Sequence, residues 1–389
     1  MTDVFILSAV RTAIGGFGGS LSGFAPIDLA SHVAKEAIAR SGVEAVQIGA
    51  SVFGHVINTE PRDMYLSRVA AMNAGIPEGA VAMNVNRLCG SGAQAIVSAA
   101  QALMLGDAEI ALAGGAECMS RAPYVLQAAR FGQKMGDTKA IDMMTGALTC
   151  PFGTGHMGIT AENVAAEGGI TRADQDAFAL ESQNRAARAI AEGRFAGQIA
   201  PIEIASRKGT VSFAVDEHPK ATTAEALAAL KPAFQKGGTV TAGNASGIND
   251  GAAALVLARG DALDGRAPRA RIMGYAVAGV APRVMGLGPI PAVEKLCAKL
   301  GLKPADFDVV ESNEAFAAQA IAVNRALGLD PARVNPNGGA VALGHPVGAT
   351  GAIITVKALH ELERSGGKTA LVTMCIGGGQ GIALAIERV

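Results

Sequence analysis

The sequence predicts an α/β protein with layers in the order α/β/α/β/α, built from two similar halves and an inserted loop domain. Two observations predict this fold class. Residues 90–116 and residues 348–379 repeat one order of features: a glycine-started apolar helix, a strand and a glycine cluster. Between these regions, residues 120–248 interrupt the βα pattern and contain five prolines. Two stacked βα halves with their central helices buried would give these layers.

The elements of the first half follow from short local patterns. Residues 4–7 are a brief apolar run after Asp3, which indicates a strand rather than a signal peptide. Residues 81–86 form a short alternating run, which is typical of a strand. Residues 93–105 are rich in Ala and lack Pro and Gly, so they favour a helix. Residues 110–113 then predict a second strand before a glycine cluster.

The second half repeats this order. Residues 307–310 form an apolar stretch that predicts a strand. A helix is expected from Gly348 to residue 362, and a strand over residues 370–374. Three consecutive glycines follow at 377–379. We therefore assign residues 1–119 with 249–268 to the N-terminal half and residues 269–389 to the C-terminal half.

Residues 120–248 are interpreted as a loop domain that covers the substrate, the alternative being an insertion without a role. Amphipathic helices are expected over residues 160–167 and 172–192, the second with Thr171 as N-cap and Asp174 three residues later. Residues 211–213 predict a strand. The polar, Met-containing stretch 156–158 favours the substrate-covering interpretation.

Composition restricts the class of protein. Of 389 residues, 50% are apolar and only 17% charged, so the chain buries much of its surface inside a core or between subunits. A net charge of −1 and the absence of Trp argue against a nucleic-acid or anionic membrane partner. Residues 88–106 approach membrane-spanning length, but polar and glycine interruptions favour a buried helix. The five cysteines fit no zinc or disulfide spacing, which indicates reduced thiols, a cytoplasmic location and no metal.

Cys89 lies in the segment NRLCGSG, residues 86–92, between a predicted strand and a predicted helix. Glycines on both sides of Ser91 allow a sharp turn and a close approach of substrate. A thiol at a helix N-terminus is expected to favour the nucleophilic thiolate. A small buried core residue is the alternative, and this segment alone does not decide between the two.

Three further segments favour a catalytic role of Cys89 over a core position. NGGAVALGHPVGATG, residues 337–351, places His345 in a glycine-rich loop before a predicted helix. CIGGGQG, residues 375–381, places Cys375 at the end of a strand, and ESNEAF, residues 311–316, places Asn313 after another. We expect all four polar residues at strand exits, where open α/β sheets carry their chemistry.

These segments resemble the thiolase family, the acyl-CoA:acetyl-CoA C-acyltransferases. Matching segments occur in order along nearly the whole chain, from RTAIG at residues 11–15 to CIGGGQG. Within the family, the chain looks most similar to the bacterial biosynthetic type. Residues 57–65 and 142–148 resemble the broad-specificity β-ketothiolases that supply polyhydroxyalkanoate synthesis. The resemblance implies a thiolase-like five-layer fold.

The resemblance also implies roles for the polar residues. Cys89 would accept the acyl group, and His345 would take its proton. Cys375 would be the base that removes the α-proton of acetyl-CoA. Asn313, through a water, and His345 would stabilise the enolate oxygen. The backbone N–H groups of Cys89 and Gly377 would form a second oxyanion hole.

Coenzyme A contacts carry over from the family by position. Ser246 matches a serine that contacts the pantetheine group. Other residues match positions of the substrate pocket: Leu148, His156, Met157, Phe234, Ala242, Met285, Ala315 and Phe316. Lys220 stands where related biosynthetic enzymes have an arginine near the nucleotide, with a neighbouring residue missing. Lysine binds phosphate without the bidentate geometry of arginine.

The expected activity is a reversible Claisen condensation of acetyl-CoA with acetyl- or propionyl-CoA. Coenzyme A thioesters would be substrates, and no cofactor is expected. A degradative 3-ketoacyl-CoA thiolase is the alternative. A related condensing enzyme would lack Cys375, and a non-catalytic acyl-CoA-binding protein would have lost part of the catalytic set. The resemblance implies a homotetramer made of two dimers, and residues 121–144, which combine apolar side chains with few charges, support that expectation.

Overall fold

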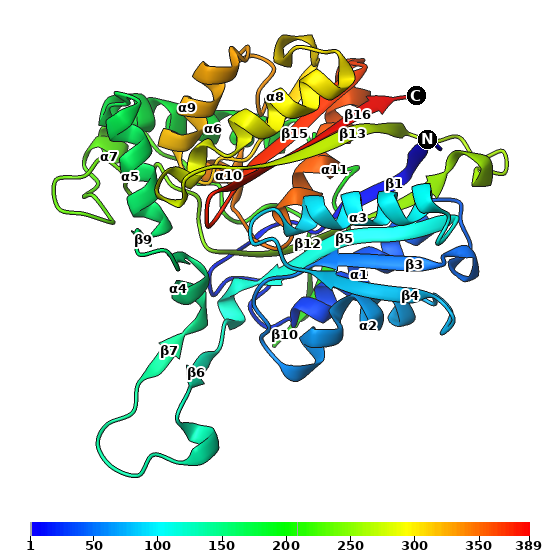
Figure 1. The fold of residues 1–389 in the computed structure, drawn as a ribbon, viewed down its shortest axis with the longest axis horizontal. Helices are drawn as coiled ribbons and strands as arrows, with labels where there is room; N and C mark the ends of the chain where they lie inside the picture. Colours follow the sequence, from blue (N-terminus) through cyan, green and yellow to red (C-terminus); the bar gives the residue numbers. More distant parts are fainter. Residues whose placement is uncertain (1, 208) are drawn as a thin grey trace.

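The computed structural model describes residues 2–207 and 209–389 and places most strands in one mixed sheet path, in the order β14-β15-β16-β13-β1-β12-β5-β3-β4 (Figure 1). The strands of this path are β1 (Val4–Arg11), β3 (Ala50–Gly54), β4 (Val81–Val85), β5 (Ile110–Cys118), β12 (Asn249–Arg259), β13 (Ala270–Gly279), β14 (Val309–Ser312), β15 (Thr369–Ile376) and β16 (Gln380–Arg388). A short β2 (Gly15–Gly16) pairs with β12 off this path.

The path consists of two sheets with the same topology. In the N-terminal half, β3 and β5 are parallel, and the pairs β5–β12 and β12–β1 are antiparallel. In the C-terminal half, β14 and β15 are parallel, and the pairs β15–β16 and β16–β13 are antiparallel. Among the described residues, the strands of the two halves are joined into one sheet where Phe5 and Ile6 pair with Arg271 and Ala270. The repeated order expected from the sequence is therefore present in three dimensions, while the residue boundaries of the three domains stay a prediction.

Helices cover both sheets and separate them. The helices of the two halves are α1 (Pro26–Ala39), α2 (Leu66–Asn73), α3 (Ser91–Leu105), α8 (Pro289–Leu300), α9 (Ala317–Leu327), α10 (Ala340–Leu343) and α11 (Thr350–Ser365). α1 packs on β1, β5 and β12, whereas α8 packs on β13 and β16. α3 packs on β3 and β5, α11 packs on β14 and β15, and these two helices contact each other. They form the central layer of the molecule.

Glycines allow this central helix pair to approach closely. A Cβ atom at Gly92 would lie 2.6 Å from the backbone nitrogen of Ala352, and one at Gly351 would lie 2.2 Å from that of Ala93. No larger side chain fits between the backbones at these points. By length and composition, residues Leu88–Leu105 would be long enough to cross a membrane. Most of this window is buried inside the protein, as the sequence analysis expected for a core helix.

The predicted elements are present with small shifts at their ends. The strand expected over residues 307–310 begins at Val309, and the helix expected over 160–167 begins earlier, at Met157. The capping of the long inserted helix is as predicted. The hydroxyl of Thr171 accepts the N–H of Asp174 at 3.1 Å, and the carboxylate of Asp174 accepts the N–H of Thr171 at 2.9 Å.

The segment between the halves contains several helices and short strands. In Figure 1 most of them lie along the left side of the molecule, while β10 lies below α1. These elements are β6 (Tyr124–Leu126), β7 (Ala140–Asp142), α4 (Met143–Ala147), β8 (Thr149–Cys150), β9 (Gly155–His156), α5 (Met157–Glu167), α6 (Arg172–Ala191), β10 (Ile202–Ser206), β11 (Gly209–Phe213) and α7 (Ala224–Ala228). The strand expected over residues 211–213 is part of β11, which pairs with β10. The β6–β7 hairpin projects away from the body of the protein.

A buried ion pair attaches this segment to the first strand. The guanidinium of Arg11 contacts both carboxylate oxygens of Asp216, at 2.6 and 2.9 Å, and neither side chain is exposed. Arg11 also donates to the side chain of Gln198 at 2.7 Å. Such a pair is costly to break on one side only, because the remaining charge would be buried without a partner.

Candidate active site

Cys89 stands at a tight turn between β4 and α3. The preceding residue, Leu88, adopts a left-handed conformation with φ of +47°, which costs an L-residue about 1 kcal/mol. Side chains on both sides hold this conformation. The amide of Leu88 donates to Asn86 Oδ1 at 2.9 Å, and the hydroxyl of Ser91 donates to the Leu88 carbonyl at 2.7 Å. The turn thereby presents the Cys89 side chain in front of α3.

Cys89 opens into a small cavity formed by both halves and by the inserted segment. The cavity is lined by Val56, Leu88, Cys89, Ala147, Leu148, Met157, Val347 and Gly377. Four of these residues were predicted from the sequence, namely Cys89, Leu148, Met157 and Gly377. The structure brings them together, although they lie nearly 300 positions apart in the chain.

Burial dominates the electrostatics of Cys89. Burial raises the pKa of its thiol, and the negative charge of Glu117 raises it further. The backbone N–H groups of Gly377 and of Cys89 itself hydrogen-bond the sulfur and lower the pKa, but less strongly. The expectation that the helix N-terminus would favour the thiolate is therefore wrong for the free enzyme. Helix α3 begins two residues later, at Ser91, and burial of the thiol is the largest effect on its pKa.

Cys375 lies near the end of β15 and is fully buried. Burial raises the pKa of its thiol, and a negative charge on Cys89 raises it further. Cys375 belongs to an apolar cluster that contains Met157, and Met157 also lines the cavity beside Cys89. A site with two coupled cysteines can carry only one thiolate readily, so each ionisation step affects the other.

His345 is buried, and its ring is held from both sides. Its Nδ1 lies 2.6 Å from the hydroxyl of Thr350, which donates its proton to the carbonyl of Pro346 at 2.8 Å. The hydroxyl must therefore accept from Nδ1–H, which leaves Nε2 unprotonated. Burial lowers the pKa of His345 to about 4, so the ring is neutral at physiological pH. A neutral Nε2 is the form that can take a proton from a thiol.

Asn313 follows β14, as predicted, and its amide nitrogen lies 3.5 Å from Nε2 of His345. Its side-chain oxygen is buried and has no hydrogen-bond partner among the described residues. A buried acceptor without a partner is consistent with a site for a water or for a donor on a ligand.

The prediction that every polar site residue follows a strand is wrong for His345. Residues 340–343 form the short helix α10 inside the segment that was expected to be a loop, and His345 lies between α10 and α11. The local sequence AVAL is apolar and compatible with a helix. It has only four residues between two glycines, which is too short a run to predict a helix from the sequence.

An apolar cluster extends the site beyond Cys375. It contains Cys150, Met157, Ala161, Val240, Ala245, Met285, Ala315, Phe316 and Cys375, with Phe234 packed against it. The ring of His156 stacks on Phe234 with 4.9 Å between centroids, and Phe234 meets Phe316 edge-on at 6.0 Å. Most of the pocket positions named from the sequence therefore belong to one continuous surface. Cys150, to which no role was assigned, belongs to it as well.

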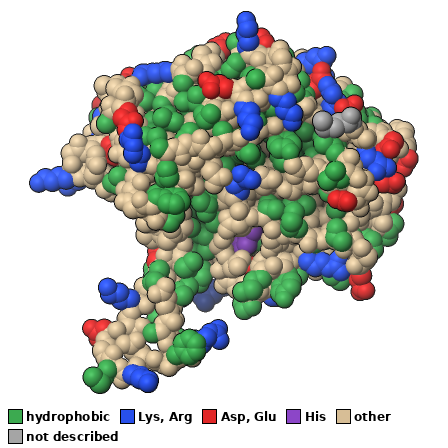
Figure 2. All heavy atoms as spheres, in the orientation of Figure 1, with side chains coloured by type: hydrophobic (Ala, Val, Ile, Leu, Met, Phe, Trp, Pro, Cys, Tyr) green, Lys and Arg blue, Asp and Glu red, His purple; other side chains and the backbone are tan. Residues whose placement is uncertain are grey.

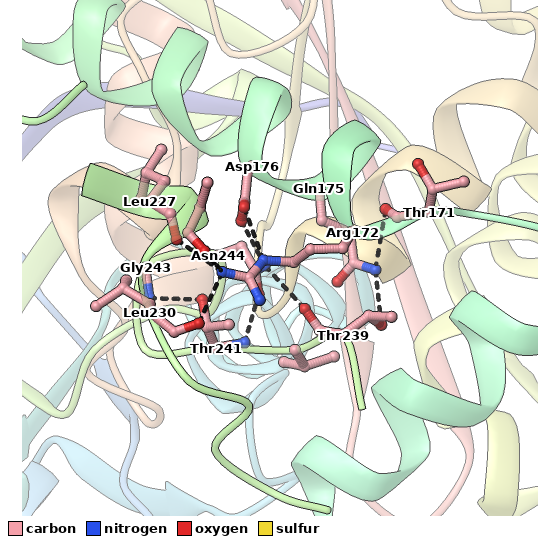
Figure 3. A network of polar contacts seen from close by, with 12 residues as sticks. Thr171, Arg172, Gln175, Asp176, Leu227, Leu230, Thr239, Thr241, Gly243 and Asn244 are labelled. Atoms are coloured by element: carbon pink, nitrogen blue, oxygen red, sulfur yellow. Dashed lines mark hydrogen bonds and ion pairs between the residues drawn. The ribbon is translucent and has the colours of Figure 1, made fainter. Parts of the chain in front are cut away.

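Ser246 lies beside this cluster through backbone pairing. Its N–H donates to the carbonyl of Ala315 at 3.0 Å, and the preceding Ala245 forms a bridge with Phe316. The segment before it is anchored by a polar network (Figure 3). Asn244 donates to Asp176 at 2.9 Å, and Asp176 accepts from Arg172 at 2.7 Å.

Two residues predicted to contact the substrate belong neither to the cavity nor to the apolar cluster. Lys220 and Ala242 are exposed. The backbone of Lys220 is fixed by its N–H, which donates to Gln183 at 3.0 Å. Its neighbour His218 packs closely on Gly247, because a Cβ atom there would lie 2.2 Å from the imidazole. Lys220 thus stands outside the cavity.

Sequence reasoning missed several residues that shape the site. Thr350 fixes the tautomer of His345, and Leu88 carries the backbone strain next to Cys89. Asn249 and Glu117 contact the loop that carries His345. Of these residues, only Thr350 could have been inferred from the local sequence, because it lies five residues after His345 at the start of a predicted helix.

The chain is similar to known proteins over its full length. Residues 4–261 match the thiolase N-terminal domain, and residues 266–388 match the thiolase C-terminal domain. Beta-ketothiolase BktB from Cupriavidus necator is 58% identical over 100% of this chain and 99% of its own length. Acetyl-CoA acetyltransferase from Pseudomonas aeruginosa is 50% identical over the full length of both proteins. The structure of human mitochondrial 3-ketoacyl-CoA thiolase in complex with CoA superposes with a TM-score of 0.97 at 45% identity, covering 100% of this chain and 98% of that one.

The chain belongs to the thiolase family and is an acyltransferase. Its thiolase-like fold, expected from the sequence, is confirmed by this superposition.

Proposed function

We propose that this enzyme catalyses the reversible condensation of acetyl-CoA with a short acyl-CoA, giving a 3-ketoacyl-CoA and CoA through an acyl-Cys89 intermediate. Three placements support this proposal: Cys89 shares a cavity with Val347 and Gly377, Met157 joins that cavity to the cluster of Cys375, and the amide of Asn313 lies 3.5 Å from His345. The names of the β-ketothiolase and acetyltransferase relatives support the substrate class.

The first half-reaction is an acyl transfer. Nε2 of His345 takes the proton of Cys89, and the thiolate attacks the carbonyl carbon of the acyl-CoA thioester. The N–H groups of Cys89 and Gly377, which already face the sulfur, stabilise the oxyanion of the tetrahedral intermediate. The carbon–sulfur bond to CoA then breaks. The departing CoA thiolate takes the proton of Cys375, so that His345 keeps its proton and Cys375 becomes a thiolate.

The second half-reaction forms the carbon–carbon bond. The Cys375 thiolate removes the α-proton of acetyl-CoA, and the protonated His345, with Asn313, stabilises the enolate oxygen. The enolate carbon attacks the carbonyl of acyl-Cys89, and the bond to the Cys89 sulfur breaks. His345 returns its proton to Cys89. The free oxygen of Asn313 suits a bridging water in this step.

The biosynthetic direction with a short acyl chain is the favoured physiological role, as in the supply of polyhydroxyalkanoate precursors. Leu148, Met157 and Val347 close around Cys89 and favour a short acyl group. A degradative 3-ketoacyl-CoA thiolase is the second candidate, because a structure with that name shares the fold over the full chain. We also propose that no metal or cofactor is needed and that the enzyme is cytoplasmic, where its five free cysteines stay reduced.

Chain length can be measured directly. We expect thiolysis of acetoacetyl-CoA and 3-ketovaleryl-CoA with kcat/KM values within about tenfold of each other, and a decrease of about a hundredfold or more for chains of eight or more carbons. The loss of absorbance of each 3-ketoacyl-CoA on addition of CoA gives these values. A rise of kcat/KM with chain length would favour the degradative role, and no thiolysis of any substrate would refute the proposed function.

Assembly follows from exposed apolar surface. The β6–β7 hairpin extends from the body and displays apolar and basic side chains (Figure 2). Phe131 and Met135 at its tip are each 90% exposed. Edge strand β4 also exposes apolar residues, among them Val81. We propose that β4 edges pair in a dimer and that hairpins join two dimers into a tetramer.

Light scattering tests this assembly. At micromolar concentration, we expect a mass near four times 39.1 kDa. The double substitution Phe131→Glu and Met135→Glu should reduce it to twice that monomer mass, because charges replace the apolar contact. A matched change at an exposed site of the body, Val46→Glu, should leave the tetramer intact. A wild-type monomer would refute both interfaces, and a wild-type dimer would refute the hairpin contact.

A further inference from the structure

The loop that carries His345 belongs to the C-terminal half but is held by the N-terminal half. Asn249, the first residue of β12, is fully buried. Its side-chain oxygen accepts the N–H of His345 at 2.9 Å, and its side-chain nitrogen donates to the carbonyl of Gly15 at 3.0 Å. Gly344 has φ of +104°, and a Cβ atom there would lie 2.5 Å from the Asn249 amide. The loop therefore lies directly on Asn249.

Glu117 holds the other end of the same loop. It lies on β5 opposite Gly251 of the adjacent strand β12, and it has no exposed surface. One carboxylate oxygen accepts the N–H groups of Gly348 and Val56, each at 3.0 Å. The other oxygen accepts the N–H of Ile57 at 3.1 Å.

The residues fixed by Glu117 adjoin the catalytic cavity. Val56 lines the cavity, and Gly348 follows Val347, which also lines it. Two neighbouring strands of the N-terminal half, β5 and β12, thus hold both ends of a loop that belongs to the C-terminal half. The ring of His55 completes the surroundings of the carboxylate, with Nδ1 3.4 Å from it.

We propose that Glu117 and Asn249 are positioning residues that clamp the loop 344–348 onto the N-terminal half and so place His345 and Val347 relative to Cys89. This inference rests on the proposed function, because the clamp affects catalysis only if His345 and Cys89 react. Neither residue touches the reacting atoms in this scheme. Both act through the backbone of the loop.

The carboxylate form of Glu117 is the form that its surroundings fit. Every polar neighbour offers a proton, since Nδ1 of His55 donates to the carbonyl of Ala116 at 2.9 Å and the other partners are amides. In Glu117→Gln the side chain keeps its shape. In either orientation of the amide, its NH₂ group faces at least one backbone N–H that donated to the carboxylate. That hydrogen bond is lost, so the clamp weakens although the substitution leaves no cavity.

Glu117→Gln should lower kcat for acetoacetyl-CoA thiolysis about tenfold or more while changing KM less than about twofold, because misplacement of a catalytic group acts on the transition state. A second readout is alkylation of Cys89 by iodoacetamide as a function of pH, which needs no CoA substrate. Its midpoint should shift to lower pH, because a buried negative charge near the thiol is removed. Among the described residues, the charge of Cys375 on β15 also couples with that of Cys89, and His55 lies beside Glu117 with Nδ1 3.4 Å from the carboxylate.

Asp63→Asn is the matched control. Asp63 is also fully buried and accepts backbone N–H groups, those of Thr59 and Glu60 at 2.7 and 3.1 Å, but it does not contact the catalytic loop. We expect its kcat and its alkylation midpoint to stay within about twofold and about 0.2 pH units of wild type. A folded Glu117→Gln enzyme with wild-type kcat and midpoint would overturn the proposal.

Asn249→Ala provides an independent test if Glu117→Gln does not fold. It removes the acceptor for the His345 N–H, so we expect a similar loss of kcat with an unchanged alkylation midpoint. Wild-type kcat in this variant would equally overturn the clamp. If wild-type enzyme shows no thiolysis but Glu117→Gln still shifts the alkylation midpoint, the proposed function fails while the buried charge of Glu117 near Cys89 stands.

Discussion

Cys89→Ser is expected to lower kcat for thiolysis and condensation by about a thousandfold or more, the largest effect of any single substitution in this enzyme. A serine hydroxyl keeps the size and hydrogen bonds of the thiol. Its proton is far less acidic, however, and neutral His345, whose pKa is lowered to about 4, is too weak a base to remove it. Both half-reactions pass through the acyl-enzyme, so both directions should be lost together.

Cys297→Ser serves as the control for this substitution. Cys297 is a buried free thiol on α8, in an apolar cluster separate from the one that contains Cys375. Steady-state kinetics should show kcat within about twofold of wild type for Cys297→Ser. If Cys89→Ser retained a tenth or more of wild-type activity, Cys89 would not be the nucleophile.

Cys375→Ser is expected to separate the two half-reactions. The variant should still transfer an acetyl group from acetyl-CoA to Cys89, but condensation should fall about a hundredfold or more, because the α-proton has lost its base. Exchange of the methyl protons of acetyl-CoA with deuterated solvent measures that step alone. We expect exchange with the wild-type enzyme and almost none with Cys375→Ser.

Asn313→Asp is an informative companion variant for the exchange measurement. It keeps the size of the side chain but removes the amide that faces His345 at 3.5 Å. Proton exchange should fall, and acyl transfer to Cys89 should persist. If Cys375→Ser exchanged protons at the wild-type rate, Cys375 would be a packing residue and another group would be the base.

Much of the fold was predictable because its signals are local. The apolar run 93–105 without Pro or Gly gave helix α3, and Thr171 with Asp174 gave the start of α6. The ends were less certain. Strand β14 starts later than the apolar run suggested, because tertiary contacts decide where a short element begins and ends. Helix α10 was not predicted, because it has only four residues and is flanked by glycines.

The site was predictable in its residue types but not in its energetics. Cys89 could be placed before a helix, yet the direction of its pKa shift depends on how much water the fold excludes, which no local pattern reveals. Glu117 meets Gly348 across 231 positions, and Asn249 meets His345 across 96. Each looks like an ordinary polar residue in its own segment.

Mass spectrometry of the intact enzyme and of its peptides after brief exposure to acetyl-CoA tests the central claim most directly. The expected result is one acetyl group, on the peptide that contains Cys89, in both wild-type enzyme and Cys375→Ser, and none in Cys89→Ser. An acetyl group on Cys375 or elsewhere with Cys89 unmodified, or turnover with no acetyl-enzyme trapped under any condition, would contradict it.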